Sequence, residues 1–312
     1  MMIKRKSEME QDKQTYHVPV LLNEVIQFLL INKNGVYVDC TFGGGGHSRA
    51  LLKELDADAK LIAFDQDEDA KQNIPDDPRI LFVPQNFRHI KRFLKLNNIE
   101  KVDGVLADLG VSSHQFDEPT RGFSTRFTGK LDMRMDQRQE MTAADLLLKY
   151  SEEQLHKLFE QYGEVTNSKT LAKTIVVGRR TINIDTIEAF KNLVSPIVKG
   201  NPNKYFAQVF QALRMEVNDE MGALKELLEQ SPDVLKAGGR IGIITFHSIE
   251  DRLVKTFFRD NTFQLEDDNP FISVEKPSLL KVVTKKPVTP SNEEIKRNPR
   301  SRSAKLRVAE RI

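Results

Sequence analysis

The chain has 312 residues, of which 39% are hydrophobic and 29% charged, a balance typical of a soluble globular protein and not of a membrane-spanning or disordered one. The first 14 residues lack the apolar stretch of a signal peptide, and the single cysteine, Cys40, excludes an internal disulfide and gives no zinc-ligand spacing. We therefore expect a cytoplasmic protein with no structural metal. The net charge is +2, but residues 285–312 carry nine Lys or Arg against three Asp or Glu, which indicates either an anionic partner such as nucleic acid or a solvated tail.

The first third of the chain alternates helix-like and strand-like segments. Apolar residues at helical spacing predict helices at residues 18–30 and 48–55. Short β-rich runs predict strands at residues 35–39, 61–65, 80–87 and 102–110. Strands separated by helices require crossover connections. The pattern therefore predicts a parallel sheet with helices on both faces.

From about residue 120 to residue 214 the signal is almost entirely helical. Ser151 and Gln154 form a capping-box pattern in front of an apolar stripe. Further helices are expected at residues 168–177, 186–198 and 204–229.

The α/β pattern resumes with an apolar run at residues 234–245, and the proline-containing tail after Asn269 is expected to be extended. This arrangement predicts one α/β domain made of residues 1–118 and 216–312. An all-helical insertion at residues 119–215 would interrupt it, and the basic tail would close it.

A glycine-rich loop follows the first predicted strand, in the run VYVDCTFGGGGHS (residues 36–48). Glycines between a strand and a helix let a nucleotide-like ligand approach the backbone and the free N–H groups of the helix. The dinucleotide fingerprint G-x-G-x-x-G fails here, because Gly43 and Gly45 are followed by Ser48 at the last position. The loop alone is equally consistent with a ligand site and with a simple tight turn.

Carboxylates end three of the predicted strands: Asp39, Asp65 and Asp108. Such residues face the ligand crevice at the carboxyl ends of parallel strands, and Asp65 can accept hydrogen bonds from both hydroxyls of a ribose. Asp65 can also act as the N-cap of a following helix, and the two roles are compatible. The three carboxylates indicate a cofactor that contains adenosine.

The run VLKAGGRIGIIT (residues 234–245) resembles the late strand of class I methyltransferases. A rim of carboxylates also suits the positively charged sulfonium and ammonium groups of S-adenosylmethionine better than it suits a pyrophosphate. Both points favour S-adenosylmethionine, which leaves S-adenosylhomocysteine as product, over a nicotinamide cofactor.

Longer motifs resemble the RsmH/MraW family, whose members are ribosomal RNA small-subunit methyltransferases. The resemblance spans nearly the whole chain, in order, and LDMRMD and HSIEDR are not generic to methyltransferases. The matching segments are HVPVLLNEV (17–25), DCTFGGGGHS (39–48), DLGVSSHQFD (108–117), RGFS (121–124), LDMRMD (131–136), FQALRMEVNDE (210–220), TFHSIEDR (245–252) and NPRSRSAKLRVAE (298–310).

The resemblance implies a class I Rossmann-like α/β fold with an inserted helical domain. It also implies an S-adenosylmethionine-dependent activity that forms 4-N-methylcytidine at position 1402 of 16S rRNA in the small ribosomal subunit. Carried over motif by motif, the expected cofactor contacts are Gly45, Gly46, His47, Asp65, Phe87, Asp108 and Gln115. The chain departs from the family after Tyr162-Gly163 and in the stretch NPNKYFAQVFQAL (residues 201–213), so contacts with RNA are less certain than the chemistry.

Methylation of an exocyclic amine requires an acceptor for a hydrogen of the amine. Many amino-methyltransferases place a proline-containing motif with an aromatic residue after the fourth strand, but this chain has Asp108 followed by Ser112 and Ser113. We expect one of these three to supply the acceptor, with His247 as a further proton acceptor or base anchor. A purely structural role at a strand end is an equal alternative for His247.

The substrate, once bound, must present an unstacked base. Five basic residues of the tail could bind rRNA phosphates: Arg297, Arg300, Arg302, Lys305 and Arg307.

Three rival readings stay open at this point: an amino-methyltransferase acting on another RNA or DNA cytosine, a nicotinamide-dependent oxidoreductase, and a non-catalytic RNA-binding protein. The sequence does not determine the oligomeric state, for which a dimer is one option.

Overall fold

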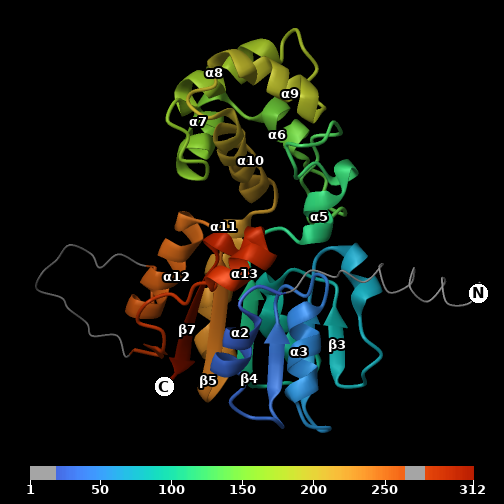
Figure 1. Ribbon diagram of the computed structural model, residues 1–312, viewed down its shortest axis with the longest axis vertical. Coiled ribbons are helices and arrows are strands. Elements are labelled where there is room, and N and C mark those ends of the chain that lie inside the picture. The colour runs from blue at the N-terminus through green and yellow to red at the C-terminus, as the bar shows by residue number, and fades with distance from the viewer. Residues whose placement is uncertain (1–18, 264–277) are drawn as a thin grey trace, which may run out of the picture.

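The computed structural model describes residues 19–263 and 278–312 and shows a sheet-containing body below a group of helices (Figure 1). The seven strands of the sheet follow the order β3-β2-β1-β4-β5-β7-β6. Strands β1 to β5 pair in parallel, whereas β7 runs antiparallel to both of its neighbours. The strands are β1 (Val36–Asp39), β2 (Lys60–Phe64), β3 (Ile80–Val83), β4 (Val102–Asp108), β5 (Leu235–Thr245), β6 (Leu280–Val282) and β7 (Lys305–Arg311). The predicted Rossmann-like α/β fold class is confirmed.

Helices bury both faces of this sheet, which explains why its central strands are continuously apolar. In β1, Val38 packs with α4, α11 and α12 on one face, while its neighbour Tyr37 packs with α2 and α3 on the other. The covering helices are α2 (Leu22–Leu29), α3 (Gly46–Glu54), α4 (Ile90–Leu96), α11 (Glu220–Val234) and α12 (Ser248–Asp260). In the described residues, no helix is long and apolar enough to cross a membrane.

The strand order reverses between β1 and β4, which lie side by side in the middle of the sheet. Ligands of open α/β sheets bind outside the carboxyl ends of the strands at such a switch point. Asp39 ends β1, Asp108 ends β4, and Asp65 directly follows β2. The fold therefore brings the three predicted carboxylates to one edge of the sheet.

Between β4 and α11 the described chain forms helices joined by loops, the longest of them before α6. The elements are α5 (Ser113–Asp117), α6 (Ala143–Lys149), α7 (Glu152–Gln161), α8 (Ser168–Gly178), α9 (Ile187–Val194) and α10 (Pro202–Val217). Apolar side chains from Phe123 to Val217 form a core of their own, separate from the clusters on the sheet. The capping box predicted at Ser151 and Gln154 opens α7. A division into domains at residues 119 and 215 stays a prediction.

The single helix predicted at residues 204–229 is wrong, because the chain breaks between α10 and α11. The Asn218 side chain donates hydrogen bonds to the carbonyls of Arg214 and Met133, and Asp219 adopts a left-handed conformation with φ 46°. The cap and the positive φ end one helix and start the next in a new direction.

The extended tail predicted after Asn269 is also wrong for the residues that the structure describes. The segment forms β6, α13 (Asn292–Arg297), a 3-10 turn (Pro299–Ser303) and β7. Leu306 and Val308 of β7 are fully buried against the sheet. Pro287 and Pro290 lie between β6 and α13, and Pro299 begins the 3-10 turn, so these prolines do not keep the segment open; Pro270 and Pro277 are outside the described residues.

Candidate active site

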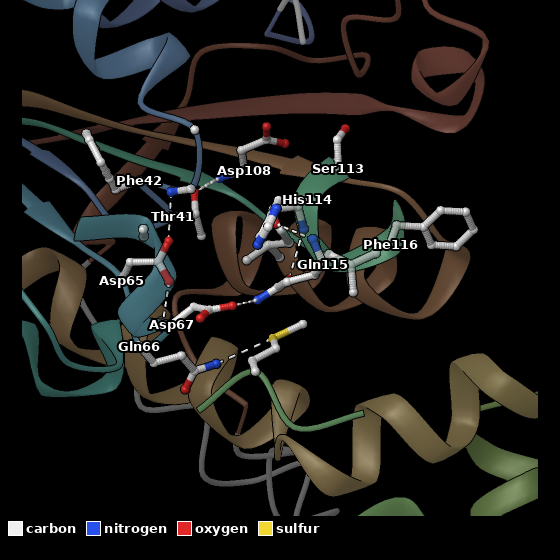
Figure 2. Close-up of a pocket in the computed structure, with 18 of the residues that line it drawn as sticks. Thr41, Phe42, Asp65, Gln66, Asp67, Asp108, Ser113, His114, Gln115 and Phe116 are labelled. Carbon is white, nitrogen blue, oxygen red and sulfur yellow. Dashed lines mark hydrogen bonds between the residues drawn. The ribbon is translucent and has the colours of Figure 1, made fainter. Parts of the chain in front are cut away.

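A cleft of about 1060 Å³ opens at the carboxyl edge of the sheet (Figure 2). Its walls come from the glycine loop, the ends of β1, β2 and β4, helix α5, and parts of α10, α11, α12 and the C-terminal segment. Nearly every residue predicted to form the site lines this cleft: Gly46, His47, Asp65, Phe87, Asp108, Ser112, Ser113, Gln115 and His247. Gly45 does not line it; instead, Gly45 is the N-cap of α3.

The glycine loop is held in place by backbone conformation and by close packing. Gly43 and Gly45 have φ of +50° and +72°, which disfavour any side chain. A Cβ on Gly46 would lie 2.3 Å from Cγ of Pro19. The backbone N–H of Gly43 donates to Oδ2 of Asp65 at 2.7 Å. The loop therefore lies close against the carboxylate that follows β2.

Both carboxylate oxygens of Asp65 accept backbone hydrogen bonds. Besides the bond from Gly43, Oδ1 accepts from the N–H of Asp67 at 2.8 Å, and burial raises the pKa of Asp65 to about 7. The 3-10 helix that follows is capped by Asp67, which accepts from Asp69, so Asp65 is not its N-cap. Asp65 is therefore a fixed, half-buried acceptor at the cleft.

His47 joins three parts of the site from the first turn of α3. Its Nε2 lies 2.9 Å from the carbonyl oxygen of Val20, and its Nδ1 lies 3.8 Å from Oδ2 of Asp108. The side chain is buried. Because the carbonyl can only accept, Nε2 carries a proton, and Nδ1 faces the carboxyl group of Asp108.

Asp108 has a carboxylate oxygen that is buried and unpartnered in the part of the chain that the structure describes. Its backbone N–H donates to Oγ1 of Thr41 at 2.7 Å, but Oδ1 is buried without a hydrogen-bond partner among the described residues. Burial raises the pKa of Asp108 to about 6. An unpaired buried acceptor is costly to the fold, which is typical of a functional position.

The two serines after β4 differ in how far their side chains are used in hydrogen bonds within the protein. Ser112 caps α5: its hydroxyl accepts from the N–H of Gln115, and its own N–H donates to Oε1 of Gln115. Ser113 starts α5 and lines the cleft. Geometry thus leaves Ser113 freer than Ser112 to contact a substrate.

Gln115 belongs to a buried polar network that sequence reasoning did not anticipate. Its Nε2 donates to Oδ2 of Asp67 at 2.7 Å, and Arg121 contacts the same oxygen at 2.8 Å. Arg121 also bonds Asp69 at 2.9 Å. Arg121 lies in the conspicuous RGFS motif, but its partners are more than 50 residues away, and no local pattern identifies them.

Replacing Arg121 by Gln should destabilise the protein by about 3 kcal/mol, because Asp67 would remain as a buried charge without its cation. Chemical denaturation monitored by circular dichroism measures this change. Lys71→Gln is the matched control, since its pair with Glu68 is exposed on both sides and should contribute less than about 1 kcal/mol. Equal losses in the two variants would contradict the assignment.

His247 is strongly tied to the junction between β5 and α12. It caps α12, with Nδ1 accepting from the N–H of Glu250 at 3.4 Å. Nε2 lies 3.0 Å from Oε1 of Glu250, but the geometry does not give an aligned hydrogen bond. Burial of Glu250 opposes its charge, yet the contact with His247 is part of what lowers its pKa. The structural role considered for His247 is present, and its ring also lines the cleft.

Phe87 lies beyond the end of β3, which stops at Val83 and is shorter than predicted. It starts a 3-10 turn capped by Asn86, and its ring reaches the cleft from the apolar cluster under α4. This position is suitable for packing against a planar ring.

The basic tail does not form one open groove. Arg307 is buried in β7 and pairs with Asp251 at 2.6 Å, and Lys305 bonds the same carboxylate. Arg297 and Arg302 are exposed, whereas Arg300 lines the cleft. The prediction that all five basic residues face RNA phosphates is therefore wrong for Arg307, because strand pairing with β5 turns its side chain into the fold.

The described residues contain no group of His, Cys, Asp or Glu side chains arranged to hold a metal ion.

Comparison with known proteins identifies the family. Residues 14–312 match the model of the MraW methylase family. The chain belongs to this family. A relative from Phocaeicola vulgatus named "Ribosomal RNA small subunit methyltransferase H" is 51% identical, covering 97% of this chain and 100% of the relative. A relative of the same name from Cytophaga hutchinsonii is 53% identical, with 95% and 99% covered.

A solved structure from Streptococcus mutans, titled as a putative methyltransferase in complex with SAH, is 11% identical with a TM-score of 0.39, covering 93% of this chain and 95% of that one. As a member of a methylase family, the protein uses S-adenosylmethionine as its cofactor.

Proposed function

We propose that this methylase transfers the methyl group of S-adenosylmethionine to the exocyclic 4-amino group of the cytidine at position 1402 of 16S rRNA, within the small ribosomal subunit. The ribosomal RNA substrate is supported by near full-length identity of about half to relatives named for that activity. The amine target is supported by one observation in the cleft, the unpartnered buried oxygen of Asp108.

The residues of the cleft fit the cofactor. Asp65 and Asp108 line the cleft and provide carboxylates next to a sulfonium and an ammonium group, whereas Asp39 lies buried behind them and accepts from the hydroxyl of Ser48. Asp65 is the acceptor for the ribose hydroxyls, and Phe87 is the surface for the adenine. When bound, the cofactor supplies an electrophilic methyl group.

The amine nitrogen of cytosine is a weak nucleophile because its lone pair is delocalised into the ring. Asp108, whose side chain lines the cleft and is 24% exposed, compensates by accepting a hydrogen of the amine on its carboxylate as the nitrogen becomes tetrahedral. The protein must also hold the amine in line with the methyl group, since alignment supplies a large part of the acceleration. Ser113, at the start of α5, is the second polar group in position to orient the base.

The pH dependence of the reaction should report this carboxylate. Because the pKa of Asp108 is raised to about 6 and its ionised form is the acceptor, kcat should fall about tenfold per pH unit below that value. Above pH 7 kcat should be flat. Measuring kcat at saturating cofactor separates Asp108 from Asp65, whose titration affects cofactor binding. A profile that stays flat down to pH 5 would remove Asp108 from the mechanism.

The decisive experiment for the substrate is mass spectrometry of the decoding-region RNA from cells that lack this gene, with and without the restored gene. We expect 4-N-methylation at position 1402 only with the gene. Tritium transfer from S-adenosylmethionine to small subunits, naked 16S rRNA and cytosine-containing DNA tests the alternative, an amino-methyltransferase acting on another RNA or DNA. Transfer to DNA and not to subunits would support that alternative.

A further inference from the structure

One polar and aromatic cluster at the mouth of the cleft takes no part in the chemistry described above. Arg126 comes from the segment after α5, and Arg300 comes from the 3-10 turn near the C-terminus. Both guanidinium groups approach the ring of Phe116, with their carbons 5.1 Å and 4.9 Å from its centroid. We call Phe116, Asp117, Arg126 and Arg300 the arginine clamp.

Asp117 binds the two arginines together. Its Oδ1 accepts from Nη2 of Arg126 at 2.9 Å and from Nη2 of Arg300 at 2.6 Å. The hydrogen bond from Arg300 is the main cause that holds the pKa of Asp117 below its usual value, and the contact with Arg126 adds to it. One carboxylate therefore orients two cations, and the clamp keeps a positive charge.

The clamp has unused hydrogen-bond donors. Arg126 donates from Nε to the hydroxyl oxygen of Ser124 and from Nη2 to Asp117. Within the described part of the chain, Nε and Nη1 of Arg300 make no hydrogen bond. All three charged side chains of the clamp are 40% to 57% exposed. Each guanidinium group can therefore still bind an anion.

The position of the clamp suggests which anion it binds. Phe116, Asp117 and Arg300 line the same cleft as Asp108. Figure 2 shows the ring of Phe116 directed away from the cleft carboxylates, on the helix that carries Ser113 and Gln115. A nucleotide whose base reaches Asp108 has to pass its backbone over the mouth of the cleft, and phosphates are the groups that paired arginines recognise.

We propose that the arginine clamp binds an RNA backbone phosphate next to the target nucleotide and so positions the strand over the cleft. This inference rests on the proposed function and adds a substrate-binding site to it. The clamp joins the C-terminal segment to the chain that follows α5, so neither segment forms the site alone. Arg126 and Arg300 are positioning residues and do not contact the reacting atoms.

The test uses the full-length protein, S-adenosylmethionine, and small ribosomal subunits from cells lacking the gene. The variants are Arg300→Gln, Arg126→Gln and the double variant, and Lys296→Gln is the control. Lys296 lies in α13, just before the 3-10 turn that carries Arg300, and it is exposed but does not line the cleft. The measurements are KM for the subunit, kcat, Kd for S-adenosylmethionine and the salt dependence of KM.

We expect each single clamp variant to raise KM for the subunit by about tenfold, and to reduce the slope of log KM against log salt by nearly one per lost phosphate contact. The Kd for S-adenosylmethionine and kcat should change less than about twofold, which also shows that the variants fold. Lys296→Gln should leave KM within about twofold of the wild type. Because both clamp residues contact one phosphate, the double variant should lose less than the product of the two single effects.

Three results would overturn the proposal. An unchanged KM in both single variants removes the phosphate contact. An equal rise in KM for Lys296→Gln shows a diffuse electrostatic effect with no defined site. A weakened Kd for S-adenosylmethionine assigns the arginines to the cofactor. If the wild-type protein does not methylate subunits at all, the proposed function fails instead, so the two failures are distinguishable.

Discussion

Replacing Asp108 by Asn should lower kcat by about 100-fold to 1000-fold, the usual contribution of a positioned proton acceptor, while the protein becomes slightly more stable at pH 8. The loss of rate follows because Asn cannot take a proton from the amine. Tritium transfer to small subunits at saturating cofactor measures kcat, and calorimetry confirms that S-adenosylmethionine still binds.

The gain in stability follows from the raised pKa. In the folded protein the carboxyl group of Asp108 titrates near 6 instead of 3.8, so its ionised form is disfavoured by folding. The contribution of Asp108 to stability is complete below about pH 4 and is lost as pH rises through about 6. At pH 8 the Asn variant should therefore be more stable by about 1 to 3 kcal/mol, whereas at pH 4 the two proteins should differ little through this group.

His247→Ala and Ser112→Ala complete this experiment. His247→Ala should also lose methyl transfer while the protein stays folded, although it removes the N-cap of α12 and about 1 kcal/mol of stability with it. Ser112→Ala should lose a similar amount through the cap of α5 but keep most of kcat. Full activity in Asp108→Asn or His247→Ala would exclude that residue from the mechanism.

Replacing Asp65 by Ala should weaken S-adenosylmethionine by about 100-fold in Kd, or roughly 2.7 kcal/mol. The proposed bonds to the ribose hydroxyls are charge-assisted and disappear. The N–H groups of Gly43 and Asp67 also lose their acceptor, which loosens the glycine loop. Isothermal titration calorimetry with S-adenosylmethionine measures the effect directly.

The control for this variant is Asp58→Asn, an exposed carboxylate in the loop before β2. It should leave Kd within about twofold, because Asp58 lies at the other end of β2 from Asp65 and its exposed charge is screened by salt. At saturating cofactor, Asp65→Ala should retain kcat within about tenfold, since Asp65 does not face the amine. An unchanged Kd in Asp65→Ala would place the ribose elsewhere.

Much of the site could be predicted from the sequence because its signals are local. A strand that ends in a carboxylate is visible in a few residues, and parallel pairing alone places Asp39 and Asp108 at the same edge. The capping box at Ser151 is equally local. The family resemblance, which rests on long ordered motifs, is confirmed by the match over residues 14–312.

What the sequence could not give are the contacts between distant residues. The approach of His47 to Asp108, the Asp67–Arg121 pair and the arginine clamp each join positions that local periodicity treats as independent. The predicted helix at residues 204–229 failed for the same reason, since Asn218 ends α10 partly by bonding the distant carbonyl of Met133.

The C-terminal segment shows most clearly what each level determined. By itself, the sequence determined its charge and its family motif, and these indicated a nucleic-acid partner. Only the tertiary structure decided that β7 pairs with β5, which buries Arg307 against Asp251 and leaves Arg300 at the mouth of the cleft. Charge is a property of each residue and can be read from the sequence. The partner that neutralises a charge depends on which strands become neighbours, and the pairing of strands is determined by burial of apolar residues across the whole sheet.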